Sequence, residues 1–216
     1  MSNIWRFVKL DFSLARPYVK TICFTIALPV VFAAINRSLM TGISFAMCFT
    51  AMISRSMFAI TEKNDMERLY GILPVRKSEL VIGRYVFIII LGILALLFSL
   101  IADPVILSRL GETVSSFDIA VAAVFGIFLF SLYTVFLLPG YYKYGSIKGK
   151  VFVYIPVVFF LITLFLITKA PADDSGWLIT VLNSPMQLLL FIAVFVVVMY
   201  VISILVSVKI VQGKEM

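Results

Sequence analysis

The chain has no histidine and little charge. Of its 216 residues, 13% are charged and 62% are hydrophobic. The missing histidine excludes the Ser-His and Cys-His nucleophile systems, His-ligated zinc sites and haem. A soluble domain carries about 25% charged residues, and the mean hydropathy here is +1.13. The composition therefore predicts an integral membrane protein.

Other chemical signatures are also missing. Runs such as VFIIILGILALLFSLIA (residues 86–102) lack the alternation that a β-barrel strand needs. Cys23 and Cys48 lie in hydrophobic runs and are interpreted as buried, unreactive thiols. The segment GSIKGKV (145–151) has neither the glycine spacing nor the Ser/Thr of a phosphate loop. We therefore expect no enzyme activity and no cofactor in this chain.

What the sequence does contain is a series of apolar runs, each of the roughly 20 residues that cross a bilayer. They predict one all-α transmembrane domain over residues 1–216, with six helices. No cleavage site follows the first run, so it is expected to be a permanent helix. The expected spans are residues 18–36, 41–60, 80–102, 118–138, 151–168 and 185–208.

The Lys and Arg residues predict the orientation. With six spans both termini share a side, and that side holds nearly all the basic residues; the other holds only Arg37, Arg109 and Lys169. Basic residues favour the cytoplasmic side, so both termini are expected there, in a multi-pass protein of the cell membrane. The net charge of +7 is then a topology signal, and nucleic acid is not an expected partner.

Charges within the predicted spans are few. Arg55 lies near the cytoplasmic edge of the second span, where it either snorkels to the headgroups or lines a cavity as a candidate pathway residue. Arg84 is expected to snorkel at the base of the third span. Asp103 and Asp118 bracket the external loop and are expected at the interface. Without a buried acid relay, proton-coupled secondary transport is not favoured.

The charged segment 61–79 separates the second and third predicted spans. Asn64 and Glu67 have the spacing of a helix start, Pro74 ends that short helix, and Ser78 is placed to cap the next one. An amphipathic helix of this kind either enters a groove on a partner, rests on lipid headgroups, or packs on the chain's own helices. Its apolar stripe comprises Met66, Leu69, Tyr70 and Leu73.

Two further segments carry their own predictions. Basic residues at helical spacing in residues 1–17 predict an amphipathic helix lying along the inner leaflet, either as an anchor alone or also as a brace for a partner. Residues 169–185 form an external segment between the last two spans. There Trp177 is interpreted as an interfacial anchor, with a small capping face as the alternative.

The stretch EKNDMERLYGILPVRKSELVIGRY (62–85) resembles the segment between the second and third spans of small type-2 ABC transporter permeases, including exporters of peptides and bacteriocins. Two positions depart from that pattern, since Thr61 stands where an acid is common and Arg84 where Lys is usual. The ordered elements of the resemblance are Glu62–Lys63, Leu73-Pro74-Val75, Arg76–Lys77 and Arg84-Tyr85.

The resemblance implies a permease half without its own ATPase. It would pair with a second permease half, as a homodimer or heterodimer, and with nucleotide-binding subunits that hold ATP and Mg²⁺. The short helix would be the coupling helix seated in a groove of the ATPase, and 169–185 would cap the pathway. The residues placed at the ATPase contact are Glu67, Arg68, Leu69, Tyr70, Leu73, Pro74, Arg76 and Lys77.

The nearly uncharged spans predict an apolar pathway suited to amphipathic peptides or lipid-like molecules. The alternative function is a six-helix membrane module that binds a small vitamin-like ligand; Asn36, Asp103, Asp118 and Asn183 would supply its polar groups. A structural or regulatory membrane protein, with the loop resting on lipid, is the third hypothesis.

Overall fold

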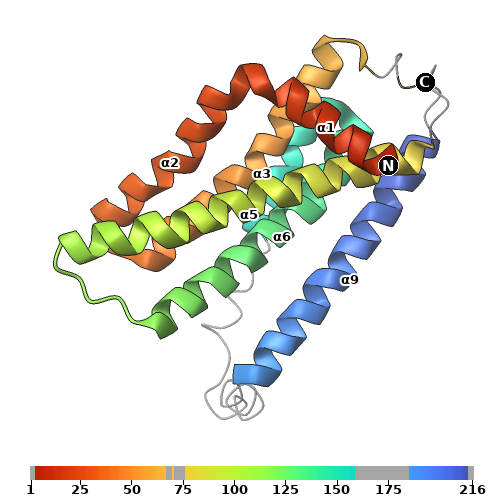
Figure 1. Ribbon diagram of the computed structural model, residues 1–216. Helices are drawn as coiled ribbons and strands as arrows, with labels where there is room; N and C mark the ends of the chain where they lie inside the picture. Colours follow the sequence, from red (N-terminus) through yellow and green to blue (C-terminus); the bar gives the residue numbers. More distant parts are fainter. Residues whose placement is uncertain (1–2, 67–69, 71–75, 159–184, 214–216) are drawn as a thin grey trace.

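The computed structural model describes residues 3–66, 70, 76–158 and 185–213, with the backbone alone at residue 3 and over 185–191. Every regular element in these ranges is helical (Figure 1). The α-helices are α1 (Asn3–Ala15), α2 (Val19–Asn36), α3 (Leu39–Lys63), α5 (Lys77–Arg109), α6 (Ser116–Lys148) and α9 (Pro185–Gln212). Two 3-10 helices, η1 (Arg16–Tyr18) and η2 (Gly149–Val153), follow α1 and α6.

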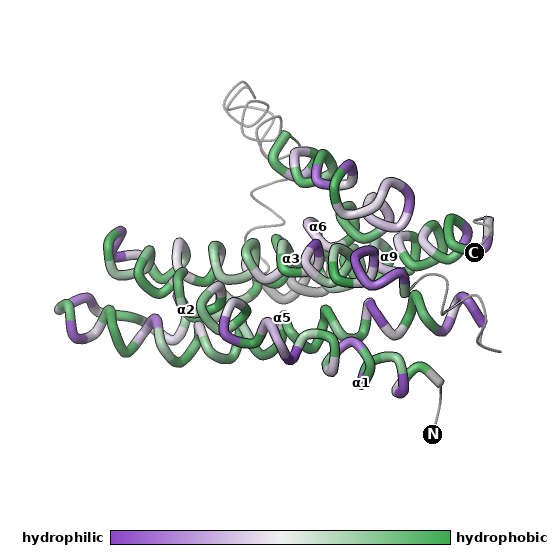
Figure 2. Tube along the Cα trace, turned by 90° about the horizontal axis from the view of Figure 1, so that it is seen from above, coloured by the Kyte–Doolittle hydropathy of each residue, from purple (hydrophilic) through white to green (hydrophobic). Residues whose placement is uncertain are grey.

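Five of the predicted spans are present as helices long and apolar enough to cross a membrane. They are α2, counted as one span with α1, and the helices α3, α5, α6 and α9. The fifth predicted span, 151–168, falls mostly outside the described residues and stays a prediction, as does the segment 169–185. Hydrophobic residues occupy the lengths of the helices and hydrophilic ones gather near their ends (Figure 2). Large apolar side chains such as Ile35 and Ile101 are exposed, as expected of surfaces that face lipid.

The helices pack around α3 and α6, which contact each other along much of their lengths. α2 packs on α3 and α5, α1 lies across α5, and α9 lies against α6 and α5. Both chain termini lie at the same end of the bundle (Figure 1). One end of each of the helices α1, α3, α5, α6 and α9 lies there too. We call this the terminal end, and the end with the α2–α3 and α5–α6 turns the opposite end.

Small residues allow the closest helix approaches. A Cβ on Gly42 of α3 would lie 2.6 Å from Cβ of Ala33 in α2, and one on Gly92 of α5 would lie 2.5 Å from the Phe130 ring in α6. Real Cβ atoms do not come this close to other atoms, so a larger residue at either position would force the helices apart. Packing of this kind is the main source of association between helices in lipid, where no hydrophobic effect acts between them.

The turns at the opposite end are closed by local hydrogen bonds. α2 ends at Asn36, and its cap residue Arg37 has a left-handed φ of 48°. Ser38 then caps α3 by accepting a hydrogen bond from Thr41 N at 3.4 Å. α6 begins with a capping box. Asp118 Oδ2 accepts a hydrogen bond from the backbone N of Ser115, and Ser115 Oγ accepts one from the backbone N of Phe117. Asp118 is exposed and borders the loop between α5 and α6, as predicted, and its place at the membrane interface stays a prediction.

Asn64 is the cap residue at the end of α3, and the short helix predicted to start there lies mostly outside the described residues and stays a prediction. Two other details of the sequence-based prediction were wrong. α5 begins at Lys77 with Arg76 as its cap residue, so Ser78 lies inside the helix. Asp103 was predicted to border the external loop, but α5 continues past Pro104 to Arg109 and buries Asp103 between helices. Helices in membranes tolerate proline because neighbouring groups satisfy the freed backbone atoms.

Candidate functional site

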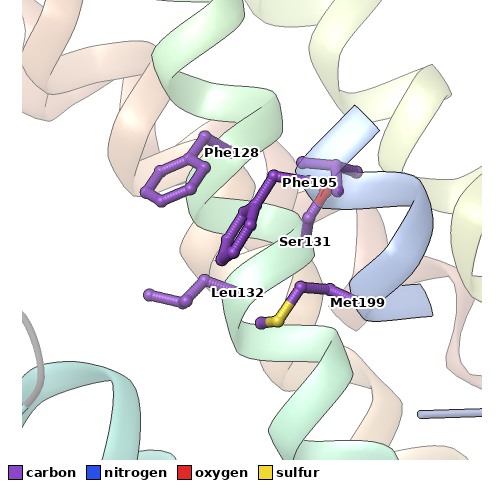
Figure 3. A pocket seen from close by; sticks show the side chains of 6 residues that line it. Phe128, Ser131, Leu132, Phe195 and Met199 are labelled. Atoms are coloured by element: carbon purple, nitrogen blue, oxygen red, sulfur yellow. The ribbon is translucent and has the colours of Figure 1, made fainter. Parts of the chain in front are cut away.

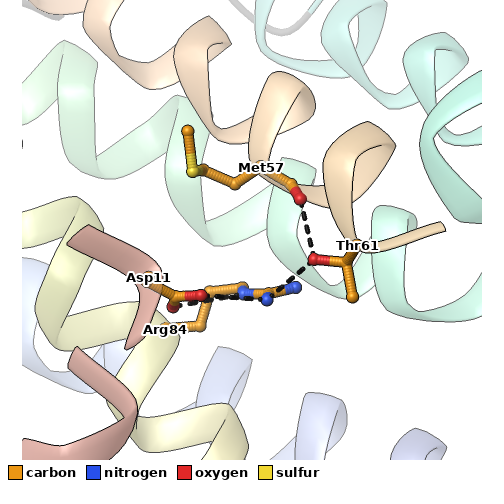
Figure 4. Close-up of polar contacts among 4 residues, drawn as sticks. All are labelled: Asp11, Met57, Thr61 and Arg84. Carbon is orange, nitrogen blue, oxygen red and sulfur yellow. Dashed lines mark hydrogen bonds and ion pairs between the residues drawn. The ribbon is translucent and has the colours of Figure 1, made fainter. Parts of the chain in front are cut away.

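A buried ion pair joins three elements beside the segment predicted to couple the protein to an ATPase. Arg84 of α5 donates from Nη2 to Oδ1 of Asp11 in α1 at 3.1 Å, and from Nε to Oδ2 at 3.4 Å (Figure 4). The same Nη2 donates to Oγ1 of Thr61 at 3.0 Å, near the end of α3, and Thr61 in turn donates to the carbonyl of Met57 at 2.8 Å. Arg84 therefore ties α1, α3 and α5 together.

This position corrects the prediction that Arg84 snorkels to the headgroups. Its exposed fraction is 3%, and its guanidinium carbon lies 4.7 Å from the centre of the Phe58 ring. The planar guanidinium presents several donors in a fixed fork, so it binds both carboxylate oxygens and a hydroxyl at once. A lysine ammonium lacks that fork, which is a physical reason for arginine here.

Tyr70, a described residue between α3 and α5, packs beside this cluster. Its side chain is 7% exposed, and its ring meets Phe7 of α1 edge-on with centres 6.1 Å apart. Burial raises the pKa of the Tyr70 phenol, and the nearby Arg84 charge opposes that shift. Tyr70 therefore lies inside the fold and attaches the loop to α1. Its predicted contact with a partner stays a prediction.

A second polar connection links α3 to α6. Glu62 accepts hydrogen bonds from the backbone N and the Oγ of Ser146, both at 2.6 Å, and Arg55 Nε donates to the Ser146 carbonyl at 3.2 Å. At Gly145 the backbone leaves the helical conformation with φ 76°, where a Cβ would lie 2.7 Å from Glu62 Oε1. Glycine thus permits both the kink in α6 and the approach of Glu62.

The structure describes only some of the predicted site residues. Arg55 is exposed and bound to the end of α6, so its predicted role in a pathway stays a prediction. Arg76 is exposed at the start of α5, and Lys77 is half-buried in its first turn. The other predicted contact residues lie outside the described residues: Glu67, Arg68, Leu69, Leu73 and Pro74.

Sequence reasoning missed the role of Asp11. The signal was present, because Asp11 is the single acidic residue in a basic N-terminal segment, and it lies on the helix face that also buries Phe7, Val8 and Ala15. A carboxylate on the buried face of an amphipathic helix requires a partner. The pattern did not say which of the many basic residues that partner is.

The described part of the bundle also contains an apolar pocket of about 210 Å³ among α3, α5, α6 and α9, with Ser131 and the Tyr200 ring as its most polar members. A narrower pocket next to it, between α6 and α9, shares Ser131 and Val196 and is otherwise lined by Phe128, Leu132, Phe195 and Met199 (Figure 3). Neither pocket is lined by a charged side chain, so this region suits apolar groups.

The sequence matches a family model described as ABC-2 family transporter protein over residues 6–212. No curated protein and no solved structure shows a significant match. The match includes most of α1, with Asp11, and the other described helices, among them α5 with Arg84. The chain therefore belongs to the ABC-2 family of transporter proteins.

Proposed function

We propose that this protein is the permease subunit of an ATP-driven ABC exporter, energised by separate nucleotide-binding subunits that dock on the segment between α3 and α5. In this proposal the terminal end is cytoplasmic, α1 lies along the inner leaflet, and a second permease half completes the pathway. ATP and Mg²⁺ act in the partner chain.

The observation that carries the proposal is the anchoring of this loop at both ends. Thr61 lies two residues before the end of α3, and Arg84 lies two turns into α5; the two are hydrogen-bonded at 3.0 Å. Tyr70, from the loop itself, packs on α1. A displacement of the loop is therefore transmitted to three helices through the buried cluster.

The same cluster suggests how ATP binding moves the spans. When the ATPase subunits close, they displace the loop, and the Asp11–Arg84–Thr61 contacts oblige α1, α3 and α5 to move together. Glu62 extends this connection to α6 through Ser146. The free energy for the change comes from ATP contacts, because cargo that binds two states equally shifts neither.

For the cargo, we propose amphipathic peptides or lipid-like molecules. The interhelical pocket is apolar, with Gly92 and Phe130 on its walls, and it is partly open between α5, α6 and α9. A cargo with an apolar face can enter such a space without leaving polar groups unpaired. Export, rather than import, is the direction we propose for such molecules.

No observation favours the ligand-binding module. Asn36 donates to the carbonyl of Phe32 in its own helix, Asp118 caps α6, and Asp103 is buried against Ser99. Three of the four polar residues expected to build the ligand pocket are thus used locally, and Asn183 lies outside the described residues. They do not form one polar cavity in the described part of the chain.

The proposal is tested by copurification from the host membrane in detergent. Wild type is compared with Leu69→Asp and Leu73→Asp in the predicted contact, and with Leu110→Asp as the matched control. Leu110 is an exposed leucine at the opposite end of the bundle. Retained ATPase is quantified by mass spectrometry, and folding by thermal unfolding and gel filtration.

We expect one ATPase subunit to copurify with wild type and with Leu110→Asp, and to be lost at least tenfold from the two loop variants while these remain folded. A charge placed in an apolar contact leaves that charge unpaired, which explains the loss. Equal retention by all four proteins, or no ATPase with wild type, would contradict the coupling function.

A further inference from the structure

Asp103 is a buried acid that has no role in the coupling cluster. Its exposed fraction is 0%, and it lies in α5 near the opposite end of the bundle, far along the helix from Arg84. Ser99, one turn earlier, donates a hydrogen bond from Oγ to Oδ2 of Asp103. Oδ1 has no hydrogen-bond partner among the described residues.

The surroundings of Asp103 are small and apolar. A Cβ built on Gly42 of α3 would lie 2.6 Å from Oδ2 of Asp103 and equally close to Cβ of Ala33 in α2. No space remains on that side for a basic side chain. The Gly42–Ala33 contact thus closes α2 and α3 over the carboxyl group of α5.

The other ionisable groups on the helices near Asp103 are exposed, bonded to other residues or not bonded to Asp103. Arg37, at the end of α2, lies 3.6 Å from Glu112, and Asp118 of α6 accepts from the backbone of Ser115. Arg109 of α5 is exposed, and Cys48 is a free thiol of α3. No hydrogen bond or ion pair is observed between any of them and Asp103 in the described part of the chain.

An ionised carboxylate in this position would have one hydrogen bond and no counter-charge. Burying such a charge costs far more than neutralising it. A protonated carboxyl group needs less, since it has one acidic proton and a weaker demand for hydrogen bonds. A metal ion is a poor alternative: hard cations take six or more oxygen ligands, and the described residues form no cluster of acids that would supply them.

We propose that Asp103 is a proton-binding site, occupied in this conformation and able to release its proton when α2 and α3 separate from α5. This separation would connect Asp103 to a nearby pocket. A pocket of about 300 Å³ at the opposite end is lined in part by Leu39 and Leu107, each within one helical turn of Gly42 and Asp103 respectively. Both leucines are buried, so they close the pocket toward the acid. This inference does not depend on the permease function.

The first test is the infrared spectrum of the full-length protein at pH 7, in a detergent without ester carbonyls. A protonated carboxylic acid has its own carbonyl stretch, which an ionised carboxylate lacks. We expect this band in wild type, its loss in Asp103→Asn, and its retention at a shifted frequency in Ser99→Ala, where one hydrogen bond is missing. A wild-type spectrum without the band, or a band that survives in Asp103→Asn unchanged, overturns the proposal.

The second test measures the linkage between protonation and folding. If folded Asp103 keeps its proton while the unfolded chain loses it above about pH 4, wild type loses stability as the pH rises. Relative to Asp103→Asn, its folding equilibrium constant should fall about tenfold per pH unit between about pH 5 and pH 7. Ser99→Ala, which keeps the acid, should retain a decline with pH. A wild type and Asp103→Asn with parallel pH dependence would overturn the proposal.

Discussion

Asp11 and Asp103 are both buried acids on helices, but their surroundings differ. At the terminal end, Asp11 is paired through both oxygens with Arg84, which also binds Thr61. At the opposite end, Asp103 has Ser99 as its hydrogen-bond donor and no cation. The ion pair at that end, Arg37–Glu112 at 3.6 Å, lies outside the core with its side chains 65% and 41% exposed.

The difference indicates how each end is held together. Ionic and hydrogen-bonded contacts cross between helices at the terminal end, so α1, α3, α5 and α6 are joined there by specific polar groups. The opposite end depends on close packing at Gly42, on caps within single elements and on the exposed Arg37–Glu112 pair. Helices joined by buried polar contacts at one end and without them at the other are suited to a movement that opens the opposite end.

The largest effect is expected from Arg84→Met, which leaves Asp11 buried without its partner. Removing one member of a buried ion pair costs about 3–5 kcal/mol. Arg37→Met is the matched control, because it breaks an exposed pair worth about 0–1 kcal/mol. The free energy of unfolding is measured by detergent denaturation of each purified protein. Similar losses in the two variants would remove the distinction between the ends.

A smaller loss is expected from Glu62→Gln. The amide keeps the shape of Glu62 but removes its charge and one acceptor from the pair of bonds to Ser146. Hydrogen bonds to charged groups contribute about 1.5–3 kcal/mol, and the partial exposure of Glu62 places the expected loss at the low end. Glu112→Gln, at the opposite end, serves as control with a loss of about 0–1 kcal/mol. A smaller effect for Glu62→Gln than for Glu112→Gln would contradict the prediction.

Gly42→Ala tests whether packing holds the opposite end. The added methyl would overlap both Ala33 and Asp103, and overpacking of this kind costs about 1–3 kcal/mol. Gly213→Ala is the control: its Cβ would come no closer than 3.5 Å to any atom. Thermal unfolding in detergent should show a lower midpoint for Gly42→Ala and little change for Gly213→Ala. Equal midpoints would mean that α2 and α3 yield easily at this contact.

Ser115→Ala gives the smallest expected effect of the set. It removes the side-chain half of the capping box at the start of α6, where loss of a cap costs about 0.5–2 kcal/mol. Because this bond lies within one element, hydrogen exchange should increase in the first turn of α6 and remain unchanged near Arg84. Faster exchange at the terminal end would show that the two ends are not independent.

Much of the fold was predictable because apolar run length limits what a chain can do in a bilayer. The runs gave the starts of four of the six spans to within two residues, at α2, α3, α6 and α9, and the start of α5 to within three. Helix ends were harder: α5 extends past Pro104 and α6 past Pro139, although proline usually signals a boundary. At Pro139 the freed carbonyl of Val135 accepts a hydrogen bond from the Ser203 hydroxyl of α9 at 2.8 Å, and a single sequence does not show such neighbours.

The buried polar cluster was not predicted from the sequence, and the ATPase contact beside it stays a prediction. The resemblance of residues 62–85 placed Glu62, Arg84 and the loop together, and Tyr70 on an apolar stripe. It gave no indication that Tyr70 and Arg84 are buried against α1. Asp11 is 73 residues from Arg84, and pairing over such a separation depends on how α1 folds back across α5.

The sequence by itself determined the solvent, the helical class and the family resemblance, since each depends on composition or on order within one short segment. Only the tertiary structure decided which charges are paired. Asp11 meets Arg84 because α1 crosses α5, whereas Asp103 is isolated because Gly42 and Ala33 bring α2 and α3 too close for any basic side chain. Burial and pairing depend on neighbours from distant parts of the chain, and these are set when the helices pack.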